Sequence, residues 1–173
     1  MQPLIKVPLR YGVIAGLVGF GLLVGLYYMG RHPLLIPVFL DFRIILFGVF
    51  IFFTLREIRD YYQNGILYFW QGIIASLLFT ACYAFIASLA LYLFVLAAPV
   101  FLSDYVNLSI QQLKSLPSQV IEQIGREVYE RNLGLLPATS ASDLGLLYFL
   151  QSFMISLFIS IILSVTLRRQ PKS

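Results

Sequence analysis

The chain has 173 residues, of which 60% are hydrophobic and 12% are charged, whereas soluble domains carry about 45–50% apolar and about 25% charged residues. Its mean hydropathy is +0.87, and the apolar residues form long runs rather than alternating faces. This composition excludes an ordinary soluble domain and indicates a membrane protein. The net charge of +4 does not indicate nucleic-acid binding, because the basic residues lie at the ends of the apolar runs.

Four apolar segments predict four transmembrane helices, at residues 11–29, 34–55, 69–94 and 146–167. The first segment is long enough to cross the hydrocarbon and is followed by no small-residue cleavage site, so we expect an uncleaved helix rather than a secretion signal. Gly30 and Pro33 predict a tight turn after it. The predicted fold class is an all-α membrane protein, with a single four-helix transmembrane domain over residues 1–173.

Residues 103–145 contain most of the polar sequence and predict an amphipathic helical loop between the third and fourth spans. Apolar side chains recur there at spacings of three or four, as an amphipathic helix requires. They are Leu113, Leu116, Val120, Ile124 and Val128. Pro117 is expected to kink or divide this helix, because proline cannot continue the backbone hydrogen bonds.

The distribution of basic residues predicts that both termini lie in the cytoplasm. With that orientation the cytoplasmic segments hold seven of the twelve Lys and Arg residues, and the opposite side holds five basic and six acidic residues. The seven are Lys6, Arg10, Arg56, Arg59, Arg168, Arg169 and Lys172. Because Lys and Arg near helix ends resist translocation, we expect a multi-pass protein of the cell inner membrane with an extracytoplasmic loop at 103–145.

Small residues repeat along one face of three predicted helices, where they would let helix backbones approach closely in lipid. The members are Gly12, Gly16 and Gly19 in the first helix, Gly72, Ser76 and Thr80 in the third, and Ser152, Ser156, Ser160 and Ser164 in the fourth. Gly21 and Gly25 lie roughly opposite the first set, so the first helix could contact two neighbours. We expect the third and fourth helices to pair through these faces, with a polar path lined by hydroxyl groups as the alternative.

Asp41 and Arg43 are the charged pair inside a predicted span, and such residues are functional candidates in membrane proteins. Two positions apart on one helix, their side chains do not face each other, so each would need another partner. Asp41 could instead cap a shorter helix that begins after Pro37. The two residues are interpreted either as structural anchors near the outer headgroups or as a site for a ligand, a proton or a partner.

The other polar residues of the spans and turns indicate no chemistry. His32 is expected to be a solvated turn residue, because a metal site or pH switch would need companion residues. Gln71 and Gln151 lie near opposite ends of their helices and are interpreted as separate interfacial amides. Cys82, the single cysteine, cannot form an intramolecular disulfide and is expected to be a small buried side chain.

No phosphate-binding glycine loop, His-Glu-x-x-His motif or serine nucleophile motif is present in the sequence. We therefore expect no enzymatic activity, no cofactor and no metal.

The order of these features resembles a bacterial membrane family defined only as domain of unknown function 4199. The resemblance spans nearly the whole chain. It rests on the glycine-rich first helix, the charged exit at 56–60, Asn64-Gly65 followed by Phe69, Gln71 and Gly72, and the serine-rich last helix that ends at Arg168-Arg169. It implies a small four-span inner-membrane protein and carries over no catalytic residue and no role for Asp41 or Arg43.

Three functions are compatible with these sequence features. The first, which we favour, is a non-enzymatic accessory or scaffold subunit that contacts membrane lipids and associates with itself or with another membrane protein through its small-residue faces and its outer loop. The second is a transporter or channel component with a site at Asp41 and Arg43. The third, an enzyme acting on a lipid headgroup, would require the outer carboxylates to converge. These are Asp104, Glu122, Glu127 and Glu130.

Overall fold

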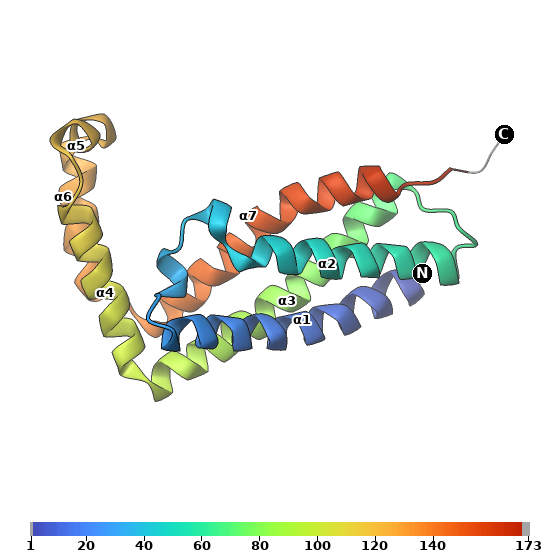
Figure 1. Ribbon diagram of the computed structural model, residues 1–173, viewed down its shortest axis with the longest axis horizontal. Helices are drawn as coiled ribbons and strands as arrows, with labels where there is room; N and C mark the ends of the chain where they lie inside the picture. Colours follow the sequence, from blue (N-terminus) through green and yellow to red (C-terminus); the bar gives the residue numbers. More distant parts are fainter. Residues whose placement is uncertain (1, 171–173) are drawn as a thin grey trace.

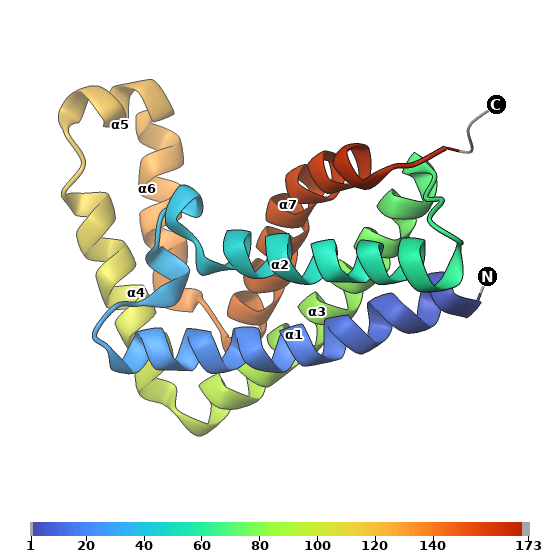
Figure 2. The ribbon, with the colours of Figure 1, turned by 45° about the vertical axis from the view of Figure 1, so that its right-hand side comes forward.

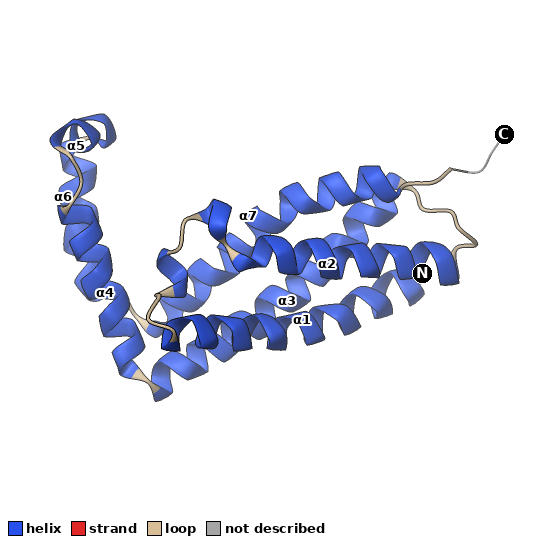
Figure 3. Ribbon diagram, in the orientation of Figure 1, coloured by secondary structure: helices blue, strands red, loops and turns tan. Residues whose placement is uncertain are grey.

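The computed structural model describes residues 2–170, which are helical apart from turns, short connections and one isolated β-bridge between Leu67 and Arg169 (Figure 3). The α-helices are α1 (Gln2–Tyr28), α2 (Phe42–Glu57), α3 (Phe69–Ala97), α4 (Pro99–Lys114), α5 (Ser118–Ile124), α6 (Arg126–Leu135) and α7 (Ala141–Leu167). Short 3-10 turns occupy Pro33–Leu35, Val38–Leu40 and Leu136–Ala138, and a π-helical turn, Ile58–Tyr62, continues α2. Lys172, one of the predicted cytoplasmic basic residues, lies outside the described range.

The helices form a bundle with an arm at one end (Figure 1). Helices α1, α2, α3 and α7 run along the long axis, and α3 packs against both α1 and α7. Helices α4, α5 and α6 form the arm, which extends across the direction of the bundle (Figures 1 and 2). The first residues of α1 and the last residues of α7 lie together at the end opposite the arm.

Three helices, α1, α3 and α7, are long and apolar enough to cross a membrane. The all-α class is confirmed for the described residues, and these three helices fit a multi-pass membrane protein. Helix α2 has 16 residues, which at about 1.5 Å per residue reach about 24 Å, whereas the hydrocarbon core is about 30 Å thick. The helix predicted at 34–55 begins later than expected, at Phe42. The reason is that Pro33 and Pro37 hold the preceding residues in two 3-10 turns.

The last apolar helix begins earlier than predicted, at Ala141, because Ser140 and Asp143 form a capping box. The Ser140 backbone N–H donates to Asp143 Oδ2 at 2.8 Å, and the Asp143 backbone N–H lies 3.4 Å from Ser140 Oγ. These bonds satisfy two of the N–H groups that a helix start leaves without partners.

The polar segment between α3 and α7 contains three helices, whereas one helix interrupted at Pro117 was expected. Pro117 does separate two of them, as the N-cap of α5. Gly125, with φ of +92°, adds a second break that the apolar spacing did not indicate, because this backbone conformation is open chiefly to glycine. Helix α4 also starts before the predicted loop, at Pro99 directly after α3.

Small residues let α1 approach α3 closely. A Cβ atom added at Gly12 would lie 2.7 Å from Cys82 Cβ and 2.9 Å from the carbonyl oxygen of Phe79. One added at Gly16 would lie 3.1 Å from Ile86 Cβ. On the other side of the same helix, nothing lies within 4 Å of a Cβ atom added at Gly21 or Gly25, so this face of α1 is open in the single chain.

The serine face of α7 lies against the small-residue face of α3. A Cβ atom added at Gly72 would lie 2.7 Å from Ser164 Oγ, and the hydroxyl groups of Thr80 and Ser156 are hydrogen-bonded across the interface. The serines of this face are fully buried, at 0% exposure, and they are Ser152, Ser156, Ser160 and Ser164. The two helices meet along the four-residue repeat that the sequence shows.

Candidate functional site

Asp41 and Arg43 form a buried ion pair near the arm end of the bundle. Asp41 is the N-cap of α2, with an extended backbone, and its Oδ1 atom accepts a hydrogen bond from the Arg43 backbone N–H at 2.9 Å. The Arg43 side chain donates from Nε to Oδ1 at 2.9 Å and from Nη2 to Oδ2 at 2.5 Å. The expectation that these residues cannot face each other was wrong because Asp41 precedes the helix, whereas the alternative of a cap after Pro37 is confirmed.

The same guanidinium group joins the start of α2 to α7. Arg43 Nη2 donates to Gln151 Oε1 at 2.9 Å, and Nη1 donates to Ser152 Oγ at 3.2 Å and to the backbone carbonyl of Tyr148 at 3.4 Å. The guanidinium carbon also lies 4.4 Å from the centre of the Tyr148 ring, a cation–π contact. All three nitrogens of the guanidinium therefore have partners inside the protein.

Tyr148 extends this network to a third helix. Its hydroxyl group lies 2.7 Å from the hydroxyl group of Tyr83 on α3, and both tyrosines are almost completely buried. The Tyr83 ring packs edge-on against Phe47 of α2 at 4.7 Å between ring centres. Neither tyrosine was predicted as a member of the site. The spacing of Tyr148, Gln151 and Ser152, at i, i+3 and i+4, indicates that these side chains share one face of α7.

The ion pair is closed to solvent. The Arg43 side chain is 3% exposed and the Asp41 side chain is 5% exposed. Burying two charges costs several kcal/mol per ion unless hydrogen bonds replace the lost water. The partners on α7 supply those bonds, so the arrangement acts as a clamp between α2, α7 and α3.

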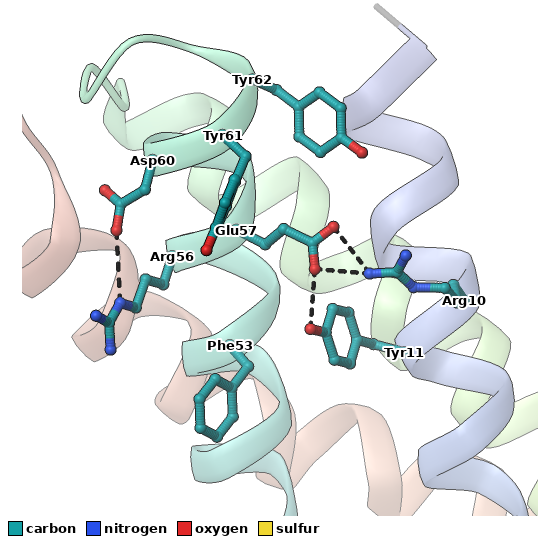
Figure 4. Close-up of a pocket in the computed structure, with 8 residues that line it drawn as sticks. All are labelled: Arg10, Tyr11, Phe53, Arg56, Glu57, Asp60, Tyr61 and Tyr62. Carbon is teal, nitrogen blue, oxygen red and sulfur yellow. Dashed lines mark hydrogen bonds and ion pairs between the residues drawn. The ribbon is translucent and has the colours of Figure 1, made fainter.

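A second polar cluster lies where α1 begins and α2 ends, around a hollow of about 560 Å³ (Figure 4). Figure 4 shows Arg10 and Tyr11 of α1 directed toward Glu57 of α2. Arg10 Nη2 lies 2.8 and 2.6 Å from the two Glu57 carboxylate oxygens, and the Tyr11 hydroxyl donates to Glu57 Oε2 at 2.9 Å. These bonds fasten α1 to α2 at the end of the bundle opposite the arm.

The last turn of α2 and the π-helical turn after it add paired charges to this cluster. Arg56 Nε lies 3.4 Å from Asp60 Oδ2, and Arg59 Nε donates to Asp60 Oδ1 at 2.7 Å. The hydrogen bond from Arg59 holds the pKa of Asp60 below its usual value, more than burial raises it. Because both carboxylates of the cluster are already paired with arginines, the hollow presents no unpaired acid among its described residues.

His32 is buried, at 7% exposure, where a solvated residue was expected. Its ring centre lies 4.5 Å from that of Phe101, 5.5 Å from that of Tyr105 and 5.9 Å from that of Tyr27. The sequence could not indicate this environment, because Phe101 and Tyr105 belong to α4, which packs over the turn after α1. Burial lowers the pKa of His32, and the backbone carbonyl of Phe101 and the charge of Asp104 oppose this effect.

The remaining sequence candidates lie apart from one another. Gln71 Oε1 accepts a hydrogen bond from the Tyr68 backbone N–H at the start of α3, far along the bundle from Gln151. Cys82 is only partly buried, and its Sγ atom lies 3.5 Å from the carbonyl oxygen of Leu9.

The carboxylates of α4, α5 and α6 do not form one cluster. Glu122, Glu127 and Glu130 are exposed on α5 and α6, whereas Asp104 accepts a hydrogen bond from the Tyr27 hydroxyl at 2.7 Å. Within residues 2–170 no group of three or more His, Cys, Asp or Glu side chains is placed to hold a metal ion.

The apolar helices, joined through buried hydroxyl groups and one enclosed ion pair, fit an α-helical multi-pass membrane protein. The chain matches a family model described as "Protein of unknown function (DUF4199)" over residues 10–169, and it belongs to this family. The resemblance seen in the order of the sequence features is thereby confirmed. No curated protein and no solved structure matches the chain.

Proposed function

We propose that the protein is a non-enzymatic accessory or scaffold subunit of the bacterial inner membrane, which associates with a second copy or with another membrane protein. The observation that carries this proposal is the closed Arg43 site. Its guanidinium nitrogens all donate hydrogen bonds to groups of the same chain. The charged pair inside the bundle therefore holds helices together, and none of these nitrogens is left without a partner to bind a substrate.

The proposal includes a four-span topology with both termini in the cytoplasm. Helix α2 is short by itself, but the two 3-10 turns before it lengthen the segment to residues 33–57 and carry exposed apolar side chains suited to lipid. These are Val38, Phe39 and Leu40. The positions of the α1 start and the α7 end at one end of the bundle support an even number of crossings. Reporter tags at the two ends should lie in the same compartment, and tags in opposite compartments would defeat this topology.

The open face of α1 is the proposed contact surface. Gly21 and Gly25, four residues apart, have no neighbouring helix in the single chain, and Leu22 beside them is 46% exposed. In lipid, such a small-residue face allows a second helix to approach closely and to gain van der Waals contact. The serine face of α7 is already covered by α3, so it is not available to a partner.

Cysteine cross-linking in native membranes tests this association. Leu22→Cys, made in a Cys82→Ser background, should give a cross-linked dimer or an adduct with another membrane protein. Ile162→Cys, on the lipid-exposed side of α7, is the matched control and should remain monomeric. Recovery of monomer alone at both positions, together with purification of the protein in mild detergent without any companion, would defeat the scaffold proposal.

The second candidate is a transporter or channel component. The observation that favours it is the continuous chain of polar groups from Asp41 through Arg43 and Tyr148 to Tyr83 at membrane depth, because intramembrane charges often mark ion or proton paths. The test is substitution by Asp41→Asn and Arg43→Gln. If both variants fold and leave growth, transport and complex formation unchanged, this candidate is excluded.

A further inference from the structure

Two adjoining hollows lie at the arm end of the bundle, where α1 and α3 leave the apolar zone. One has a volume of about 330 Å³ and is lined in part by Tyr27, Tyr28 and Asp104. The other has a volume of about 490 Å³ and includes Arg31 and Phe42. His32 and Leu108 line both hollows, so the two are adjacent parts of one surface feature.

The smaller hollow has the chemistry of an ammonium site. The Asp104 carboxylate is held by the Tyr27 hydroxyl at 2.7 Å through Oδ2, and it forms no ion pair with any basic side chain in residues 2–170. The rings of Tyr27 and Tyr28 meet edge to face, with 5.5 Å between their centres. A carboxylate beside aromatic rings attracts a cation by charge and through the ring quadrupoles.

His32 forms part of the wall of both hollows. Its Nε2 atom lies 3.3 Å from the Phe101 carbonyl oxygen, which can only accept, so Nε2 carries the proton. Its Nδ1 atom is buried, so His32 shapes the wall and the Asp104 carboxylate is the acceptor that faces an ammonium group. A primary ammonium can donate an N–H hydrogen bond to that carboxylate, whereas a quaternary ammonium has no N–H to donate.

The larger hollow has the complementary chemistry. Arg31 is exposed and forms no ion pair with a described carboxylate, so its guanidinium is available to a phosphate group. The remaining wall is mainly apolar and includes Leu35, Leu40 and Phe42. Leu40 is 66% exposed, so its apolar side chain is available to an acyl chain. An anion site above an apolar surface matches the phosphate and upper acyl chain of a phospholipid.

We propose that these two hollows form a binding site for a phospholipid with a primary ammonium headgroup, phosphatidylethanolamine. The ammonium group lies between the Asp104 carboxylate and the rings of Tyr27 and Tyr28. Arg31 binds the phosphate, and an acyl chain follows the apolar wall toward Phe42. The site goes beyond the proposed scaffold role, since it needs only that this end of the bundle lies at a membrane surface.

Native mass spectrometry of the full chain released from detergent tests the site with three lipids of equal chain length: phosphatidylethanolamine, phosphatidylcholine and phosphatidylglycerol. We expect phosphatidylethanolamine to bind about tenfold more tightly than the other two, the ratio expected from one hydrogen bond to a charged group. Asp104→Asn should remove this preference while keeping an acceptor for the Tyr27 hydroxyl. Arg31→Gln should weaken the binding of all three lipids.

Glu130→Gln and Arg131→Gln, at exposed positions on α6, are the matched charge controls and should change nothing. Equal binding of the three lipids, or an unchanged preference in Asp104→Asn, would overturn the proposal. If Asp104→Asn does not fold, Tyr27→Phe removes the hydrogen bond that orients the Asp104 carboxylate and should reduce the preference for phosphatidylethanolamine, and an unchanged preference in that variant would overturn the proposal. Soluble glycerophosphoethanolamine is the second arm: binding as tight as that of the lipid would overturn the membrane-lipid assignment and leave a site for the free headgroup compound.

Discussion

Arg43 and Tyr148 are 105 residues apart in the chain, yet the guanidinium carbon of one lies 4.4 Å from the ring centre of the other. The contact joins the first turn of α2 to the buried face of α7, and Asp41 neutralises the charge from the adjacent N-cap position. A short helix that could not span the hydrocarbon by itself is thereby attached to a longer one.

Loss of the arginine should destabilise the bundle. In Arg43→Gln the Asp41 carboxylate stays buried without its ionic partner, and breaking a buried pair in this way costs about 3–5 kcal/mol. We expect a corresponding loss in the free energy of unfolding, measured by denaturant titration in mild detergent with a probe on α2.

The double variant Asp41→Asn with Arg43→Met is the control for that prediction. Asparagine keeps the N-cap acceptor, and methionine fills most of the arginine volume without a charge. Because a well-packed neutral replacement of a buried ion pair is often close to neutral, the double variant should recover most of the lost stability. A double variant as unstable as Arg43→Gln would mean that the clamp acts through something other than paired charge.

Close approach of α1 and α3 predicts that adding one methyl group has opposite effects at two glycines. Gly12→Ala should destabilise the protein by about 1–3 kcal/mol, because overpacking at a tight contact forces backbone movement, and the new Cβ would meet the Phe79 carbonyl oxygen at 2.9 Å.

Gly21→Ala, measured on the monomer in detergent, is the matched control on the open face of the same helix. It should be neutral or stabilising by up to about 1 kcal/mol, the difference in helix propensity between the residues. Thermal unfolding of both variants in detergent measures the contrast, and equal losses at the two positions would contradict the packing of α1 on α3.

The hydrogen bond between Thr80 and Ser156 predicts a small but measurable coupling between α3 and α7. In a double-mutant cycle of Thr80→Val and Ser156→Ala, we expect a coupling of about 0.6 kcal/mol, the average for such bonds in membrane bundles. The value should be small because each hydroxyl has a further partner: Thr80 donates to the Ser76 carbonyl, and Ser156 lies near Ser160. A coupling near zero would show that shape alone holds this interface.

His32 predicts that the arm loosens in mild acid. Burial lowers its pKa below the ordinary value of 6.5, so as the pH falls below about 6.5 the unfolded chain takes up a proton before the folded chain does, and stability decreases until the folded pKa is reached. Asp104 and Tyr105 of α4 and Tyr27 of α1 face the ring, and only Asp104 among them carries a charge that favours the protonated form.

Hydrogen exchange of residues 99–105 at pH 7.5 and pH 5.5 measures this effect. Protection, taken relative to the intrinsic exchange rate at each pH, should be weaker at the lower pH in the natural sequence, and His32→Phe, which keeps an aromatic ring without a titrating group, should remove most of the difference. An unchanged pH dependence in His32→Phe would assign it to another residue.

Several features were predictable from local sequence because their causes are local. Long apolar runs indicate membrane helices by length alone, and the four-residue repeats of small residues mark a helix face whatever packs against it. The capping role of Asp41 could be foreseen from the proline before it. The resemblance to a family rested on the same local motifs, taken in order.

Other features required the fold. The burial of His32 depends on Phe101 and Tyr105, which reach it only because α4 turns back across the end of the bundle. The partners of Arg43 lie on α7, which begins about a hundred residues later. The position of Tyr148 in the sequence does not show that its ring will contact the Arg43 guanidinium. The second break of the arm at Gly125 depends on a single backbone angle.

Helix periodicity and transfer into lipid act on neighbouring residues, so the apolar runs, the places where helices can form and the small-residue faces all follow from local sequence. The pairing of Asp41 with Arg43, the burial of His32 and the open glycine face of α1 follow from the packing of the helices. Those outcomes depend on contacts between segments far apart in the chain, and local spacing does not specify which segment packs against a given residue.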